Sequence, residues 1–313
     1  MAATDVAPLA GLRTGAARRA RLGELAFQGA MLFALLLGLV ILLVLIADIL
    51  TGAVPLFRER GLGFVTAPLS ARPAEAGVWQ GILGSVQIVV ITVLLAFPVG
   101  IATAVYLEEY APSNRFTRFI DVNIRNLAGV PSVVYGLLGL ALFVGTLGPD
   151  GLANVTNGAT VIAGGLTLAV LALPIVIITA AEAIRAVPGS LREGGYGLGA
   201  TRWQVTRQLT LPNAAPGILT GMILSLSRVI GETAPLIVVG AATGFLAYGD
   251  ASFVERLYGK YTALPVIVFQ WSRQPGREYV DALAPAAILV LLLFTLSANA
   301  IAIVLRNRYE KRA

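Results

Sequence analysis

The sequence contains no cysteine and no histidine among its 313 residues. It therefore has no disulfide framework, no thiolate or imidazole ligand for a metal, no cysteine nucleophile and no histidine general base. Charge is also scarce, because Asp, Glu, Lys and Arg make up 13% of the chain, against about 25% in ordinary soluble domains. These absences exclude most self-contained active sites and argue against a water-soluble globule.

Apolar residues dominate what remains. They make up 57% of the chain, and the mean hydropathy is +0.82. A chain of this length holds roughly five to seven membrane spans of about 20 residues each. We therefore predict an all-α, polytopic membrane protein with six transmembrane helices, at residues 26–50, 80–107, 127–147, 159–183, 214–246 and 282–305.

The first apolar segment follows a basic N-terminal segment, residues 1–25. At 25 residues it is longer than the 7–15-residue core of a signal peptide, so we expect a retained helix rather than a cleaved leader. Residues 51–79 contain three prolines, among them Pro55, and several charges, which predicts an extracytoplasmic loop without a continuous helix. Pro98 predicts a kink in the second span.

The distribution of basic residues indicates the orientation. With six spans both termini face the same side, and the segments on that side carry fifteen Lys or Arg residues against seven in the other loops. The positive-inside rule therefore places both termini, the 185–212 loop and the basic tail 306–313 in the cytoplasm. Because topology accounts for the net charge of +6, we expect no nucleic-acid partner. The sequence also has no glycine-rich phosphate loop, so any ATP chemistry belongs to a partner.

The segment 185–212, between the fourth and fifth spans, is more patterned than a simple connector. Pro188 and Ser190 supply a stop and a new helix start, and a short helix from Leu191 can end at Gly199. A plain solvated basic loop is the alternative. A second short helix is expected before Pro212 opens the fifth span, with these apolar residues near one face: Trp203, Val205, Leu209 and Leu211.

This segment resembles the EAA loop of ABC-importer permeases. Glu193-Gly194-Gly195 is followed after three residues by Gly199, after nine more by Leu209 and after one more by Leu211-Pro212. The family pattern, Glu-Ala-Ala, three, Gly, nine, Ile, one, Leu-Pro, has the same spacing throughout. In that family the loop is a coupling helix that docks into a groove of the ATPase subunit. The resemblance therefore assigns the following residues to ATPase coupling: Glu193, Gly194, Gly195, Gly199, Ala200, Thr201, Arg202, Trp203, Leu209 and Pro212.

A second unusual feature is the pair Arg228 and Glu232 within the fifth apolar segment. An ionised arginine at the centre of a membrane helix costs roughly 2.5–3.5 kcal/mol, so it should face protein or a water-filled cavity. Side chains at positions i and i+4 share a helix face, and these two can neutralise each other. One interpretation is a structural ion pair that lets the helix insert. The other is an anion site, because arginine is a permanently charged planar donor suited to oxyanions.

Residues 228–236 read Arg-Val-Ile-Gly-Glu-Thr-Ala-Pro-Leu. They resemble the Arg-Ala-x-Gly-Glu-Thr-Ala-Pro-Leu stretch of phosphate ABC-transporter permeases of the PstA type. The likeness covers about residues 80–305, which would form the permease transmembrane domain, with the first span as an additional helix. It implies the type I ABC-importer permease fold, phosphate as the cargo, and Arg228, Glu232 and Thr233 on the substrate pathway.

The resemblance also implies partners in a bacterial cell membrane. These are a homologous permease subunit of the PstC type, an ATP-binding dimer of the PstB type that carries ATP and Mg²⁺, an extracytoplasmic phosphate-binding protein of the PstS type, and membrane lipid. This chain would bind no cofactor or metal and would not itself be an enzyme. An ABC permease for another oxyanion or small solute remains open. So does an ion-coupled secondary transporter or channel, which would bind its coupling ions within the chain.

Overall fold

The computed structural model describes residues 13–153, 155–242 and 253–310, and all regular structure within them is helical. Five helices are long and apolar enough to cross a membrane, and a sixth is obtained if one bent pair counts as a single span. The all-α, six-helix prediction is therefore confirmed. The chain divides into two compact units, residues 1–51 and 52–313.

The first span is helix α1 (Arg13–Arg60), and the prediction that Pro55 prevents a continuous helix there was wrong. A proline removes one backbone hydrogen bond from a helix. The turn around Pro55 nevertheless places Ala53 and Phe57 against an apolar cluster. The Nη1 atom of Arg60 also donates a hydrogen bond to the carbonyl oxygen of Ala76 at 2.8 Å. Packing and this hydrogen bond outweigh the local preference for a break.

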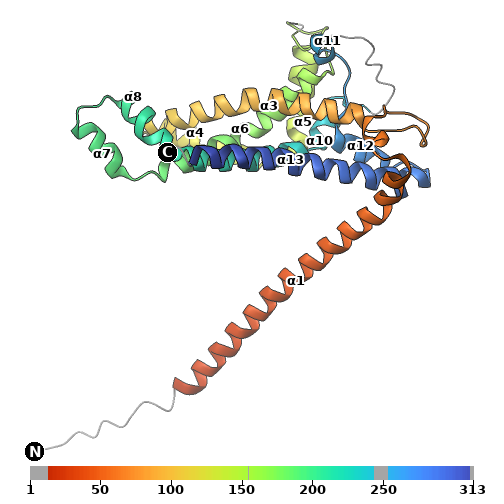
Figure 1. Cartoon of the computed structure of the whole chain (residues 1–313). Coiled ribbons are helices and arrows are strands. Elements are labelled where there is room, and N and C mark those ends of the chain that lie inside the picture. The colour runs from red at the N-terminus through yellow and green to blue at the C-terminus, as the bar shows by residue number, and fades with distance from the viewer. Residues whose placement is uncertain (1–12, 154, 243–252, 311–313) are drawn as a thin grey trace, which may run out of the picture. The chain divides into compact units, whose positions relative to one another are not determined.

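Four long helices run side by side in the 52–313 unit (Figure 1): α3 (Trp79–Val105), α6 (Val161–Arg185), α9 (Leu211–Gly231) and α13 (Ala284–Glu310). Helix α6 is the most buried of these and packs between α3 and α9, while α13 packs against α9. Small residues allow the close approach, since a side chain at Gly221 of α9 would collide with Thr179 of α6. Helix α3 runs through Pro98 without interruption, and the kink there stays a prediction.

The third span is not one straight helix over 127–147, as predicted. It consists of α4 (Arg115–Ala128) and α5 (Ser132–Gly139), the latter prolonged by the π-helical turn η2 (Leu140–Thr146), with a bend of 101° between α4 and α5. Pro131 directly precedes α5 and cannot continue α4. The hydroxyl of Tyr135 donates to the carbonyl oxygen of Leu127 at 2.9 Å, which joins the two helices across the bend.

The fifth apolar segment, predicted as one helix over 214–246, is also broken. Helix α9 ends at Gly231, Glu232 has extended backbone angles, and a short helix α10 (Ala234–Val238) follows. Residues 243–246 of the prediction lie outside the described residues. A side chain at Gly136 of α5 would meet Pro235, so α10 packs closely on α5. The break therefore forms next to the bent third span.

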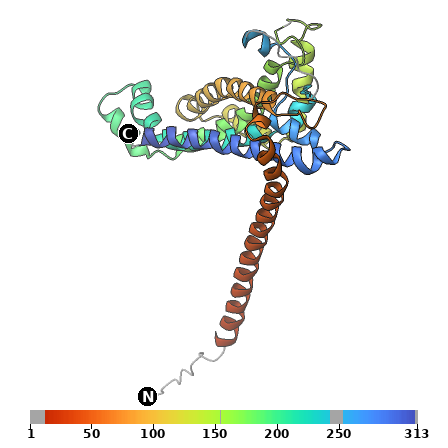
Figure 2. The same ribbon diagram turned by 45° about the vertical axis from the view of Figure 1, so that its right-hand side comes forward.

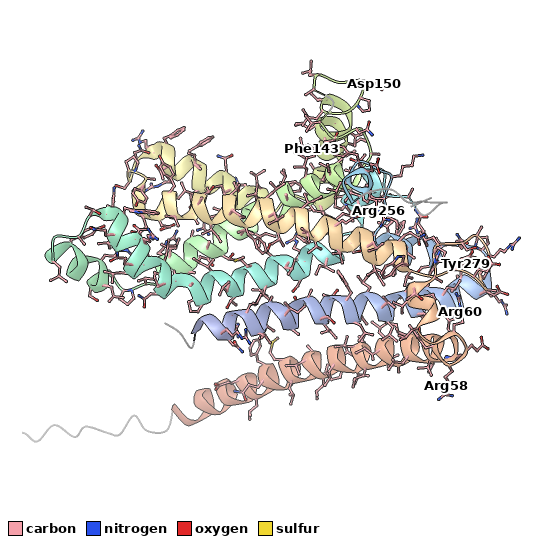
Figure 3. All side chains as sticks on the ribbon, turned by 45° about the horizontal axis from the view of Figure 1, so that its top comes forward. Arg58, Arg60, Phe143, Asp150, Arg256 and Tyr279 are labelled. Atoms are coloured by element: carbon pink, nitrogen blue, oxygen red, sulfur yellow. The ribbon has the colours of Figure 1, made fainter. Side chains whose placement is uncertain are left out.

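The predicted polar loop 247–281 contains α11 (Phe253–Leu257) and α12 (Leu264–Trp271). Helix α12 is largely buried and packs in one apolar cluster with α2 (Gly63–Thr66) and with the π-helical turn η4 (Tyr279–Leu283), which leads into α13. Figure 3 shows Arg60 and Tyr279 at this end of the unit. A segment whose composition predicted a loop therefore contributes to the hydrophobic core. The sequence did not indicate this, because the apolar run within α12 is too short to be recognised as a membrane span.

The opposite end of the unit carries α7 (Gly189–Gly197) and α8 (Arg202–Val205), beside the C-terminal end of α13 (Figures 1 and 2). Helix α13 extends beyond the predicted limit of 305 to Glu310, and the tail residues 311–313 lie outside the described residues. At this end the Nη1 atom of Arg306 donates to the hydroxyl of Thr220 in α9 at 3.3 Å.

Candidate coupling loop and substrate pathway

The first half of the loop forms the short helix predicted from its sequence. Helix α7 follows Pro188, and Gly199 has a φ of +81° just beyond its end. The N–H of Gly199 donates to the carbonyl of Tyr196 at 2.9 Å, and that of Ala200 donates to the carbonyl of Gly195 at 3.1 Å. This is a Schellman motif with glycine at its left-handed position. The predicted end of the short helix near Gly199 is confirmed.

The second half of the loop continues directly into the membrane helix α9. Thr201 caps α8 through a reciprocal capping box with Gln204. Helix α8 then runs through the π-helical turn η3 (Thr206–Thr210) into α9, so the prediction that Pro212 opens a separate helix was wrong. A π turn changes the backbone hydrogen-bond pattern in front of Pro212, and the proline lies in the first turn of α9, where it is tolerated.

Two departures from the EAA pattern have different surroundings. A Cβ atom on Gly194 would meet nothing within 4 Å, whereas one on Gly195 would lie 2.9 Å from Val205 and 2.8 Å from Leu209. Gly195 therefore allows α7 to approach the following helix closely. Val205 is fully buried and Leu209 half-buried, but Trp203 is 55% exposed, so the predicted apolar face includes Val205 and Leu209 without Trp203.

The tip of the loop presents apolar surface beside a free carboxylate. Leu198 is 91% exposed, and Tyr196 and Trp203 are also exposed. Glu193 is exposed and forms no ion pair with any residue that the structure describes. Exposed aromatic and aliphatic side chains grouped on a protruding element are typical of protein–protein contact sites.

Glu109 belongs to the surroundings of this loop, although no motif in the sequence indicated it. It lies in the π-helical turn η1 (Tyr106–Tyr110) at the end of α3, and its carboxylate binds Arg192 of α7. The available signal was the consecutive pair Glu108-Glu109, two acidic residues at the end of a span whose flanking segments are basic.

The second site lies where α9 ends. Arg228 is in the last turn of α9 rather than at the centre of a long helix, and the helix dipole there favours a cation. Its Nε atom lies 3.4 Å from Oε1 of Glu232, so the predicted pair forms. Glu232 has left the helix, and Thr233 precedes α10. The structure therefore brings Arg228, Glu232 and Thr233 together at the break between α9 and α10.

The Arg228 side chain has unused capacity to bind an anion. A guanidinium has five N–H donors, and within the described part of the chain only Nε of Arg228 has a hydrogen-bond partner. The Arg228 side chain is 48% exposed, whereas that of Glu232 is 16% exposed. A single contact at 3.4 Å is long for a charge-assisted bond. The arrangement pairs the arginine only loosely with Glu232 and leaves its remaining N–H donors open to an oxyanion.

No group of three metal-ligating side chains occurs among the residues searched, which are those that the structure describes. Chemically, the open N–H donors of Arg228 suit reversible binding of an anion.

Comparisons with known proteins identify the family of the chain. Residues 96–313 match the family described as "Binding-protein-dependent transport system inner membrane component". The "Probable ABC transporter permease protein YqgI" of Bacillus subtilis is 35% identical over 75% of this chain and 81% of its own length. The "Phosphate transport system permease protein PstA 1" of Mycobacterium tuberculosis is 33% identical over 71% of this chain and 68% of its own.

Among solved structures, a bacterial alginate ABC transporter in complex with an alginate pentasaccharide-bound periplasmic protein contains a similar chain. The TM-score is 0.62 at 17% sequence identity, covering 93% of this chain and 98% of the other. At that identity the likeness concerns the fold alone.

Proposed function

The chain belongs to the binding-protein-dependent transport system inner membrane component family, and on that premise we propose that it is the permease subunit of an ATP-driven phosphate importer. It is a multi-pass membrane protein and a transporter subunit rather than an enzyme. In this role it forms half of the pathway through which inorganic phosphate crosses the membrane.

The observation that carries the proposal is the Arg228–Glu232 pair at the break between α9 and α10. A guanidinium with open donors suits a tetrahedral oxyanion, and the neighbouring carboxylate balances its charge when no anion is bound. Broken helices that present charged groups inside a membrane are a common construction of transporter sites. The relatives named for phosphate transport support phosphate as the oxyanion.

The exposed tip of α7 and α8 supports a partner that supplies ATP hydrolysis. We assign this surface to an ATP-binding subunit dimer of the PstB type that holds ATP and Mg²⁺. The half-exposed Arg228 would be enclosed by a homologous permease subunit of the PstC type. A phosphate-binding protein of the PstS type would deliver phosphate at the opposite end, around α12.

Phosphate uptake by the reconstituted complex tests this function. In proteoliposomes that contain both permease subunits and the ATPase, with the binding protein supplied outside, we expect uptake of radiolabelled phosphate that requires ATP. A tenfold excess of sulfate should leave it unchanged. Uptake without ATP would instead indicate a secondary transporter, and stronger competition by sulfate or molybdate would indicate another oxyanion.

The proposed orientation places α7, α8 and both termini in the cytoplasm, as the positive-inside rule indicates. Because the chain has no cysteine, a single cysteine introduced at exposed Ser190 is a clean probe. In intact cells Ser190→Cys should react with a thiol reagent only after the membrane is permeabilised. Labelling of intact cells by an impermeant reagent from outside would show that the orientation is the opposite of the proposed one.

A further inference from the structure

The π-helical turn η1, at the end of the span that begins with α3, holds three neighbouring elements at once. Three consecutive residues of this turn each meet an arginine from a different helix: Glu108 meets Arg185 of α6, Glu109 meets Arg192 of α7, and Tyr110 meets Arg202 of α8. Two of these three arginines, Arg192 and Arg202, lie in α7 and α8, which are the two short helices of the coupling loop. The end of one membrane span is therefore connected to both parts of that loop.

Among these contacts, the one between Glu109 and Arg192 is the most enclosed. Oε1 of Glu109 accepts hydrogen bonds from Nε and Nη2 of Arg192 at 3.0 and 2.9 Å. The Glu109 side chain is 4% exposed and that of Arg192 is 22% exposed. Arg192 also donates to the carbonyl oxygens of Val187 and Ile184, both at 2.8 Å. Its guanidinium therefore joins α7, the end of α6 and η1.

This contact is suited to transmitting force. Arg192 projects from the middle of α7, whereas the chain itself connects α7 to the bundle only through the turns at Pro188 and Gly199. Chain turns can rotate when a helix is displaced. A planar guanidinium with hydrogen bonds in several directions resists rotation and shear, because each bond has its own preferred direction.

We propose that Arg192 and Glu109 form a strut through which displacement of α7 moves the span Trp79–Tyr110. Both are positioning residues, and the proposal rests on the function proposed above. ATP-driven movement of the loop would then reach α3 directly as well as through α6 and α9. The pair of Glu108 and Arg185, whose side chains are 20% and 54% exposed, involves the adjacent residue of η1 but connects it to α6 and not to α7. It is therefore a matched control.

The test measures the number of phosphate ions imported per ATP hydrolysed by the complete complex in proteoliposomes. Glu109→Gln removes the charge of the strut and keeps its shape. We expect a fall in this ratio of about two- to thirtyfold with continued ATP hydrolysis, because mutations along a coupling path change the coupling by such factors. The control Glu108→Gln should change the ratio by less than about twofold, because the pair it weakens connects η1 to α6 and does not involve α7.

A ratio equal to that of wild type in Glu109→Gln would overturn the strut, whether both rates stay unchanged or import and hydrolysis fall in the same proportion. A fall in the same proportion would mean that the pair only maintains the fold of the loop. If Glu109→Gln does not assemble, Arg192→Lys receives the same test, because lysine keeps the charge but not the fork that reaches Ile184 and Val187. Its ratio should also fall, and a wild-type ratio would overturn the strut.

The strut and the proposed function can fail separately. If the wild-type complex imports a solute other than phosphate, the substrate assignment is wrong. The ratio of import to hydrolysis is then measured with that solute and still tests the strut.

Discussion

Replacing Arg228 with glutamine is expected to reduce ATP-driven phosphate uptake by about 10- to 100-fold, since a hydrogen bond to a charged group contributes about 1.5–3 kcal/mol. Glutamine keeps an amide donor for Glu232, and the Arg228 side chain is half exposed, so the complex should still assemble. The measurement is uptake of radiolabelled phosphate by a complex whose subunit composition has been checked by gel filtration.

Two companion variants separate an anion site from a structural ion pair. Arg228→Lys retains the charge but loses the planar fork, so partial uptake would show that charge is sufficient, and little uptake would show that bidentate geometry is required. The double variant Arg228→Gln with Glu232→Gln removes both charges. If the pair only allowed the helix to insert, this variant would transport phosphate like wild type. That result in an assembled, ATP-hydrolysing complex would defeat the site assignment.

The second large effect is expected at Gly199, where φ is +81°. A residue with a Cβ atom in this left-handed region costs about 1–2 kcal/mol, and a β-branched residue costs more. Gly199→Val should therefore alter the turn between α7 and α8. We expect the variant to insert normally but to lose binding-protein-stimulated ATP hydrolysis by about tenfold or more, which corresponds to that cost.

Gly197→Val is the matched control for this effect. A Cβ atom at either glycine would meet nothing within 4 Å, but only Gly199 has a positive φ. The two substitutions therefore differ in backbone strain and not in available space. Stimulated hydrolysis should remain close to wild type in Gly197→Val. If Gly199→Val couples like wild type, the turn plays no part in the mechanism. If both variants lose stimulated hydrolysis equally, the cause is the added side-chain volume on the loop surface and not backbone strain.

Local features of the chain were predictable from the residues alone. The length of each apolar run determines whether a helix can cross a membrane, which is why the spans around 80–107, 159–183 and 282–305 correspond closely to helices. The left-handed turn at Gly199 follows from a glycine placed just after a short helix, because no other residue adopts that conformation cheaply. The spacing of four between Arg228 and Glu232 likewise indicated their contact.

Departures from the predicted helices arose where distant residues compete with local preferences. Pro55 remains inside α1 because the surrounding turn is packed and hydrogen-bonded from residues farther along the chain. The apolar runs 127–147 and 214–246 each indicated one span, yet α4 and α5 meet at 101° and α9 stops at Gly231. The composition of a segment shows how long its apolar run is, but it does not show where the helix bends or ends within that run.

The strut shows most clearly the difference between what local sequence indicates and what tertiary packing decides. Glu109 and Arg192 are separated by 83 positions, and no local pattern connects them. Their contact exists because α3 and α6 pack side by side and bring η1 next to α7. Burial then turns an ordinary pair of charges into a directional connection. The residues of the chain therefore determined which segments enter the membrane, where the loop turns and which charges pair within one helical turn, while tertiary packing decided which charged groups distant in sequence meet.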